Sequence, residues 1–117
     1  MGLFDRLFGK PAPVLSAVEL QQKIKSGKHP FVLDVRQSDE YRTGHIPGAK
    51  LIPLGEIKQK IKDLPRQREI VCVCDSGSRS GSASRMLVSE GYQVFNLRGG
   101  MKSWQKEKLP VKKGMAS

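Results

Sequence analysis

A chain of 117 residues with 38% hydrophobic side chains can fold as one domain with a buried core, and no apolar run in it is long enough to span a membrane. The formal net charge of +10 admits a polyanionic partner, but the lysines are scattered and the few aromatic residues do not alternate with them. We therefore expect a solvated basic surface that attracts small anions. We expect neither a nucleic-acid partner nor an integral membrane span.

Residues 1–13 are interpreted as a separate amphipathic and linker segment. Four apolar side chains would share one face of a short helix: Leu3, Phe4, Leu7 and Phe8. Asp5 and Arg6 interrupt the apolar stretch, so it lacks the pattern of a secretory signal, and Pro11 and Pro13 form a stiff linker. Such a segment is expected to pack on its own domain or to stay disordered. The missing signal, together with two cysteines that look reduced, predicts a cytoplasmic protein.

The first half of the remaining chain is predicted to alternate helices with strands. Ser16 and Glu19 have the spacing of a capping box at the start of a helix, and Gly27 has the properties of a residue that ends one. Ser38 is expected to cap a second, short helix. The predicted elements are a helix over residues 16–27, a buried strand over 31–35, a short helix over 38–41 and a short strand over 50–53.

The second half continues the alternation. Apolar residues recur at helical spacing before Pro65, and the β-branched run at residues 70–73 is typical of a strand buried on both faces. The predicted elements are a helix over residues 54–64, a strand over 70–73, a helix that stops at Gly91, a strand over 92–97 and a helix over 101–106. This order predicts an α/β domain over residues 14–111, with a central, mainly parallel sheet of about five strands flanked by helices. Residues 112–117 are expected to form a mobile basic tail.

Cys74 follows the strand predicted at residues 70–73 and precedes a helix. Ligands bind at the carboxyl ends of parallel strands, and the free N–H groups at a helix N-terminus favour an anion. A thiolate, which is the reactive form of cysteine, should therefore be stabilised at this position. A lone cysteine is more often a small buried hydrophobe, but the small polar residues and the arginine that follow Cys74 favour a nucleophile.

Six residues after Cys74 form the predicted binding loop: Asp75, Ser76, Gly77, Ser78, Arg79 and Ser80. Their small side chains let the backbone approach a ligand closely, and Arg79 adds a fixed positive charge. Cys72 should point to the same face of the strand as Cys74. Its expected role is packing, and the alternative role is that of a resolving thiol for Cys74. We expect no metal site, because His29 and His45 lie in other segments and no cluster of ligands is completed.

Several short segments match, in order, the motifs of one known family. They are Val32-Leu33-Asp34-Val35-Arg36, Glu40-Tyr41, Gly44-His45-Ile46-Pro47-Gly48-Ala49, Ile52-Pro53-Leu54, Cys74 with Gly77 and Arg79-Ser80, and Asn96-Leu97-Arg98-Gly99-Gly100 with Trp104. On these motifs, about residues 14–110 resemble the single-domain rhodanese-like sulfurtransferases. The resemblance implies a three-layer rhodanese fold with the catalytic cysteine at the base of a cradle-shaped loop.

The resemblance also implies an activity. Cys74 would take a sulfane sulfur from thiosulfate or another persulfide donor, hold it as a persulfide, and pass it to cyanide or to a thiol. The partners would be a small sulfur-containing anion or persulfide and a thiol protein such as a thioredoxin-like protein. No metal or organic cofactor is implied. The alternative from a different class is a non-catalytic sulfur-relay or protein-binding module.

Loop length separates the two enzymatic alternatives. Cys74 and Arg79 enclose four residues, the spacing of the sulfurtransferases, whereas the phosphatases related to them enclose one more. A sulfur atom is smaller than a phosphoryl group, so a longer loop makes a wider cradle. Phosphatase or arsenate reductase activity is therefore the less favoured alternative.

Asp75 is a departure from the family pattern, since many thiosulfate-using relatives carry a basic residue beside the cysteine. A carboxylate there should weaken the binding of a dianion, so we expect poor affinity for thiosulfate. Asp34 and Arg36 are expected to support the neighbouring loop. His45 belongs to a segment that is structural in this family, and Gly100, with the glycine before it, should let the backbone pass close to the loop.

Overall fold

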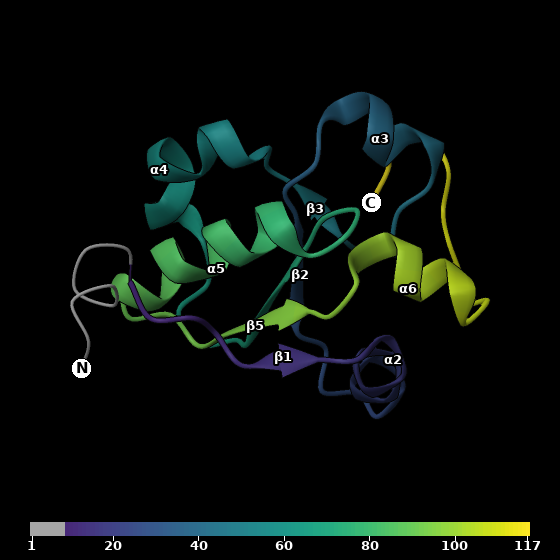
Figure 1. Ribbon diagram of the computed structural model, residues 1–117, viewed down its shortest axis with the longest axis horizontal. Helices are drawn as coiled ribbons and strands as arrows, with labels where there is room; N and C mark the ends of the chain where they lie inside the picture. The colour runs from purple at the N-terminus through teal and green to yellow at the C-terminus, as the bar shows by residue number, and fades with distance from the viewer. Residues whose placement is uncertain (1–8) are drawn as a thin grey trace.

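A computed structural model describes residues 9–117, so the predicted apolar face at Leu3, Phe4, Leu7 and Phe8 lies outside the described residues. Within the described range, one parallel sheet has the strand order β1-β5-β4-β2-β3 (Figure 1). Its strands are β1 (Val14–Leu15), β2 (Phe31–Asp34), β3 (Lys50–Leu51), β4 (Ile70–Val73) and β5 (Val94–Leu97). The prediction of an α/β domain with a parallel sheet is confirmed.

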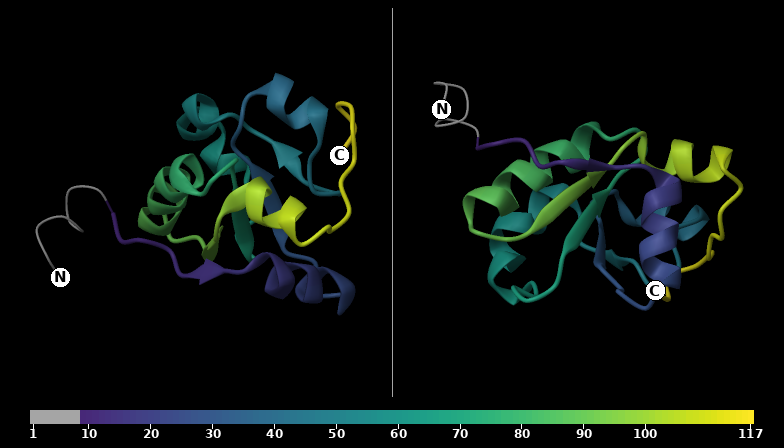
Figure 2. Two further views of the ribbon diagram at one scale, coloured as in Figure 1. Left: turned by 45° about the vertical axis from the view of Figure 1, so that its right-hand side comes forward. Right: turned by 90° about the horizontal axis from the view of Figure 1, so that it is seen from below.

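Helices cover both faces of the sheet (Figure 2). They are α2 (Ala17–Lys25), α3 (Ser38–Thr43), α4 (Ile57–Lys60), α5 (Ser78–Ser89) and α6 (Gly100–Lys106), with the 3₁₀ turns η1 (Leu54–Glu56) and η2 (Ile61–Asp63) on either side of α4. Helices α2, α3 and α6 pack against one face, and α4 and α5 pack against the other. The domain therefore has three layers.

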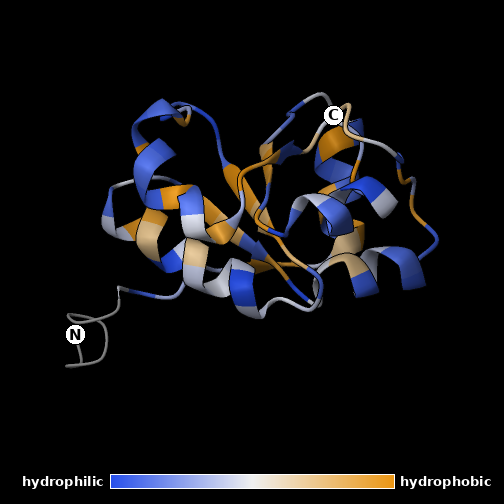
Figure 3. Cartoon of the chain, turned by 90° about the horizontal axis from the view of Figure 1, so that it is seen from above, coloured by the Kyte–Doolittle hydropathy of each residue, from blue (hydrophilic) through white to orange (hydrophobic). Residues whose placement is uncertain are grey.

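Strand β4 is central and is buried along its whole length. Successive side chains of a strand point to opposite faces, so Val71 and Val73 join the core under α2, α3 and α6. Ile70 and Cys72 join the core under α4 and α5, and so does Cys74 just beyond the strand. Figure 3 shows that hydrophobic residues gather in the central strands, while the helices alternate hydrophobic with hydrophilic residues. Cys74 therefore lies at the carboxyl end of the central strand of the sheet.

Several local expectations differ from the structure. The strands expected over residues 50–53 and 92–97 are shorter, at Lys50–Leu51 and Val94–Leu97. The helix expected over residues 54–64 is divided into η1, α4 and η2. The two-residue strand β1 was not predicted, because Val14 and Leu15 are too few for a periodic pattern and form a strand only by pairing with β5. The N-cap of α3 is Gln37 and not Ser38, because the Glu40 carboxylate accepts the Gln37 backbone N–H at 3.1 Å. The predicted capping box between Ser16 and Glu19 is confirmed.

The C-terminal tail does not project from the domain, so the expectation of a mobile tail is wrong. Lys112 and His45 form an antiparallel bridge in which each backbone N–H donates to the other residue's carbonyl, at 2.8 and 2.9 Å. The His45 ring is fully buried, is stacked on Tyr41, and has its two nitrogens 2.9 Å from the Tyr41 carbonyl and 2.8 Å from the Ala116 carbonyl. His45 thus holds the tail against the end of α3.

Candidate active site

Cys74 lies directly after β4, where the chain turns into the loop that leads to α5. The residue is buried, with only 1% of its surface exposed. The sulfur accepts the Gly77 backbone N–H at 3.0 Å and lies 3.3 Å from the Ser80 hydroxyl. Gly77 has a φ of +105°, a left-handed conformation that glycine adopts without steric cost, and it is the N-cap of α5. The loop thus bends back so that hydrogen-bond donors face the sulfur.

Helix α6 orients the peptide groups of this loop. The backbone N–H of Met101 donates to the Cys74 carbonyl at 2.8 Å, and that of Lys102 donates to the Asp75 carbonyl at 3.0 Å. The C=O and N–H groups of one trans peptide unit point in opposite directions. Because both carbonyls face α6, the N–H groups that follow them, those of Asp75 and Ser76, are directed away from α6 and toward the inside of the loop.

The close approach of α6 requires a residue without a side chain. A Cβ atom on Gly100 would overlap the Cys74 carbonyl oxygen and would lie 2.7 Å from the Asp75 carbonyl oxygen. Gly100 also has a φ of +55°, which side-chain-bearing residues rarely adopt. The sequence-based expectation that the backbone passes close to the loop at this glycine agrees with the structure.

The two cysteines have opposite chemical environments. Burial raises the pKa of the Cys74 thiol, but hydrogen bonds from Ser80, Gly77 and Ser76 outweigh it and leave that pKa below its usual value. Burial raises the pKa of Cys72 to about 12. Thiolate is the reactive form, so the environment favours Cys74 as the nucleophile and Cys72 as a packing residue.

Arg79 and Glu40 form a bidentate ion pair, with nitrogen–oxygen distances of 2.7 and 2.8 Å. The hydrogen bonds from Arg79 hold the pKa of the Glu40 carboxyl at about 2. The pair joins the start of α5 to helix α3 and orders the loop. The Glu40 carboxylate balances much of the charge of Arg79, so less positive potential reaches the sulfur than the sequence suggests.

Asn96 on β5 contacts the loop twice. Its Oδ1 accepts the Ser80 hydroxyl at 2.6 Å, and its Nδ2 donates to the Gly77 carbonyl at 3.1 Å. Sequence reasoning identified neither Glu40 nor Asn96 as a site residue. Both belong to segments that match the family motifs, but no local spacing connects either of them to Cys74.

The remaining predicted residues lie around the loop. Asp75 is paired with Lys102 of α6 at 3.6 Å, and both side chains are well exposed. Asp34 and Arg36 form a buried ion pair at 2.8 Å, and Arg36 also donates to the Gly44 carbonyl at the end of α3 at 2.8 Å. Since α3 carries the Glu40 partner of Arg79, this pair can support the loop indirectly. The described contacts of Asp34 and Arg36 do not include Cys74.

The sequence profile of the rhodanese-like domain matches residues 16–107. The chain belongs to the rhodanese-like family. A sulfurtransferase from Allochromatium vinosum is 33% identical over 98 residues, which are 83% of this chain and 92% of that protein. Bacillus subtilis YrkF, named as a candidate sulfur carrier, is 39% identical over 93 residues, which are 79% of this chain and only 50% of YrkF. The crystal structure of a rhodanese-related protein from Thermoplasma volcanium has 33% identity and a TM-score of 0.80, and the match covers 86% of this chain and 97% of that one.

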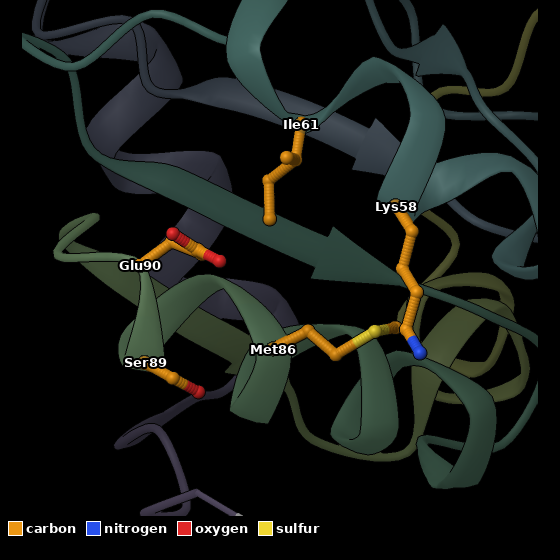
Figure 4. Close-up of a pocket in the computed structure, with 5 residues that line it drawn as sticks. All are labelled: Lys58, Ile61, Met86, Ser89 and Glu90. Atoms are coloured by element: carbon orange, nitrogen blue, oxygen red, sulfur yellow. The ribbon is translucent and has the colours of Figure 1, made fainter.

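The rhodanese-like domain also has a hollow between α4 and α5 that is distinct from the loop (Figure 4). Its volume is about 350 Å³, and its lining residues are Lys58, Ile61, Met86, Ser89 and Glu90. Met86, Ser89 and Glu90 lie toward the C-terminal end of α5, whereas Cys74 precedes its N-terminal end. The Cys74 loop is the better candidate for an active site, because hydrogen-bond donors converge there on a nucleophile.

Metal ligands do not cluster within residues 9–117, where no three His, Cys, Asp or Glu side chains are placed to share an ion. Within the same range, no helix of the rhodanese-like domain is long and apolar enough to cross a bilayer.

Proposed function

We propose that this rhodanese-like protein is a sulfurtransferase that carries sulfur as a persulfide on Cys74. The observation that supports this most is the environment of the Cys74 sulfur, which faces the Gly77 N–H and the Ser80 hydroxyl at the N-terminus of α5. These donors favour the thiolate needed for attack.

In the loading step, the Cys74 thiolate attacks the sulfane sulfur of the donor. A bond forms between the Cys74 sulfur and that sulfur, and the donor's own sulfur–sulfur bond breaks. The electron pair of the broken bond leaves with sulfite when the donor is thiosulfate, or with a thiolate when the donor is a persulfide. The inward N–H groups of Asp75 and Ser76 would stabilise the negative charge on the terminal sulfur.

In the unloading step, cyanide or an acceptor thiolate attacks the terminal sulfur, and Cys74 leaves as a thiolate. A leaving group of lowered pKa departs more readily, so the hydrogen bonds to the Cys74 sulfur assist this step as well. We propose a thiol protein, for example of the thioredoxin-like class, as the physiological acceptor. The cytoplasm is the proposed location, because its reducing conditions keep free cysteines such as Cys72 and Cys74 as thiols.

The charges near Cys74 favour a persulfide over thiosulfate as the donor. Asp75 places a carboxylate next to the nucleophile, and Arg79 is paired with Glu40. A dianion such as thiosulfate should therefore bind weakly, while a persulfide with one negative charge is repelled less. The relative named as a candidate sulfur carrier is consistent with sulfur relay between proteins.

Intact mass spectrometry tests the proposal. Reduced wild-type protein and Cys74→Ser are incubated with thiosulfate or with glutathione persulfide, and Cys72→Ser serves as the matched control. We expect one added sulfur on wild type and on Cys72→Ser, reversed by cyanide, and none on Cys74→Ser. Absence of added sulfur with both donors would overturn the proposal, and hydrolysis of an aryl phosphate by the same protein would favour the phosphatase alternative.

A further inference from the structure

Ser80 stands between two groups that can each accept its hydroxyl proton. Its Oγ is 2.6 Å from Asn96 Oδ1 and 3.3 Å from the Cys74 sulfur. A serine hydroxyl has one proton to donate. The shorter contact goes to Asn96, so the resting geometry favours donation to the amide over donation to the sulfur.

The orientation of the Asn96 amide is fixed by its second contact. Asn96 Nδ2 is 3.1 Å from the Gly77 carbonyl oxygen, which can only accept a hydrogen bond. The NH₂ group must therefore face Gly77, and the amide oxygen must face Ser80. A flipped amide would place two acceptor oxygens together at Gly77 and would lose the hydrogen bond there.

We propose that Asn96 competes with the Cys74 sulfur for the single hydroxyl proton of Ser80 and is thereby a positioning residue that sets how readily Cys74 becomes a thiolate. While Cys74 is a thiol, its S–H can donate to the Ser80 oxygen, and Ser80 donates to Asn96. When the thiolate forms, the Ser80 hydroxyl rotates its proton to the sulfur, and Asn96 Oδ1 loses that donor.

The same rotation serves the sulfur-transfer cycle, a consequence that rests on the proposed function. In the persulfide, the Cys74 sulfur has two covalent bonds and no charge, so the Ser80 proton returns to Asn96. When an acceptor removes the terminal sulfur, Cys74 leaves with the electron pair of the broken bond, and the Ser80 proton turns back to it. The hydroxyl stays intact throughout, and the proton changes only its hydrogen-bond partner.

Replacing Asn96 by an uncharged residue removes none of the charged and titratable groups around Cys74. They are Cys72 on β4, Asp75 in the loop, Arg79 on α5, Glu40 on α3 paired with Arg79, and Lys102 on α6 paired with Asp75. A change in Cys74 reactivity on replacing Asn96 therefore reports on hydrogen bonding.

A double-mutant cycle separates competition for the Ser80 proton from loss of the Gly77 contact. The pH profile of Cys74 alkylation by iodoacetamide is measured for wild type, Asn96→Ala, Ser80→Ala and the double variant, with the modified residue located by peptide mass. Asn96→Ala removes the Gly77 contact whether residue 80 is serine or alanine, so the effect of that loss cancels from the comparison. Ser82→Ala, an exposed serine on the same helix, and Gln93→Ala, an exposed amide near β5, are the controls.

We compare the shift in the alkylation pKa of Cys74 caused by Asn96→Ala when Ser80 is present with the shift it causes in the Ser80→Ala background. The first shift should be lower than the second by about half a pH unit, which is about a threefold change in the thiolate-to-thiol ratio. Equal shifts in both backgrounds would overturn the proposal. An upward shift seen only when Ser80 is present would also overturn it, because it would mean that Asn96 helps Ser80 to donate. Asn96→Val, which suits a strand, replaces Asn96→Ala if thermal unfolding shows that the alanine variant does not fold.

Sulfur uptake from glutathione persulfide, followed by intact mass in the same variants, keeps this inference apart from the proposed function. Coupling between Asn96 and Ser80 without any sulfur uptake would leave the proton competition standing and overturn the sulfurtransferase. Sulfur uptake without coupling between Asn96 and Ser80 would support the sulfurtransferase and overturn the proton competition.

Discussion

The Arg79 guanidinium donates two hydrogen bonds to the carboxylate of Glu40, a residue 39 positions earlier in the chain. The contact joins the active-site loop to α3, whose end is held in turn by the buried Arg36. The loop that holds Cys74 is thus stabilised by α3, which lies outside the unit formed by β4, the loop and α5.

Glu40→Gln should lower the free energy of unfolding at pH 7 by about 1–2 kcal/mol, a value reduced for the partial exposure of both side chains. The folded-state pKa of Glu40 is about 2 against an ordinary value of 4.5, so wild type loses this stabilisation as the pH falls from 4.5 toward 2. Urea unfolding as a function of pH measures the difference. Glu56→Gln, which removes an exposed pair with Lys60, should cost only about 0.5 kcal/mol or less. A loss for Glu40→Gln that stays constant down to pH 2 would contradict the assignment.

Gly100→Ala should destabilise the domain by about 3 kcal/mol or more, because the new Cβ meets rigid backbone at Cys74 and Asp75. Gly48→Ala is the matched control. Gly48 also has a positive φ, of +87°, but a Cβ there has nothing within 4 Å, so only the backbone strain of about 1 kcal/mol applies. Thermal and urea unfolding of the two variants provides the comparison. Similar losses would show that the close approach of α6 to the loop is unimportant.

Asp75→Ala should lower the Michaelis constant for thiosulfate about three- to tenfold, because it removes a negative charge beside the nucleophile and frees Lys102. The gain should shrink at high salt, since the site is exposed. Steady-state transfer of sulfur to cyanide at two ionic strengths measures this effect. Asp39→Ala, which removes an exposed carboxylate from α3, should leave the constant unchanged. A low constant in wild type that Asp75→Ala does not alter would refute the electrostatic argument.

Cys74 should react with iodoacetamide at a pH below the ordinary thiol range, whereas Cys72, with a pKa of about 12, should stay unmodified up to pH 9 in the folded protein. Peptide mass mapping after a timed reaction at each pH distinguishes the two sites. Both thiols should react in urea, which serves as the control. Rapid modification of Cys72 in the folded state would revive its role as a resolving thiol.

Features that depend on residues close together in the sequence could be predicted from the sequence alone. The capping box at Ser16, the alternation of strands and helices, and the position of Cys74 between a buried strand and a helix all follow from local spacing. The Cys74 loop was recognisable because its small residues and Arg79 are contiguous.

The distant groups that meet this loop became visible only in the folded chain. The strand order places β5 beside β4, which brings Asn96 to Ser80, and the packing of α3 and α6 brings Glu40 to Arg79 and Gly100 to the Cys74 carbonyl. The tail was misjudged for the same reason, since Lys112 pairs with His45 across the fold. Local periodicity reports which face of an element is buried, but the partner across an interface depends on how the elements are ordered in space.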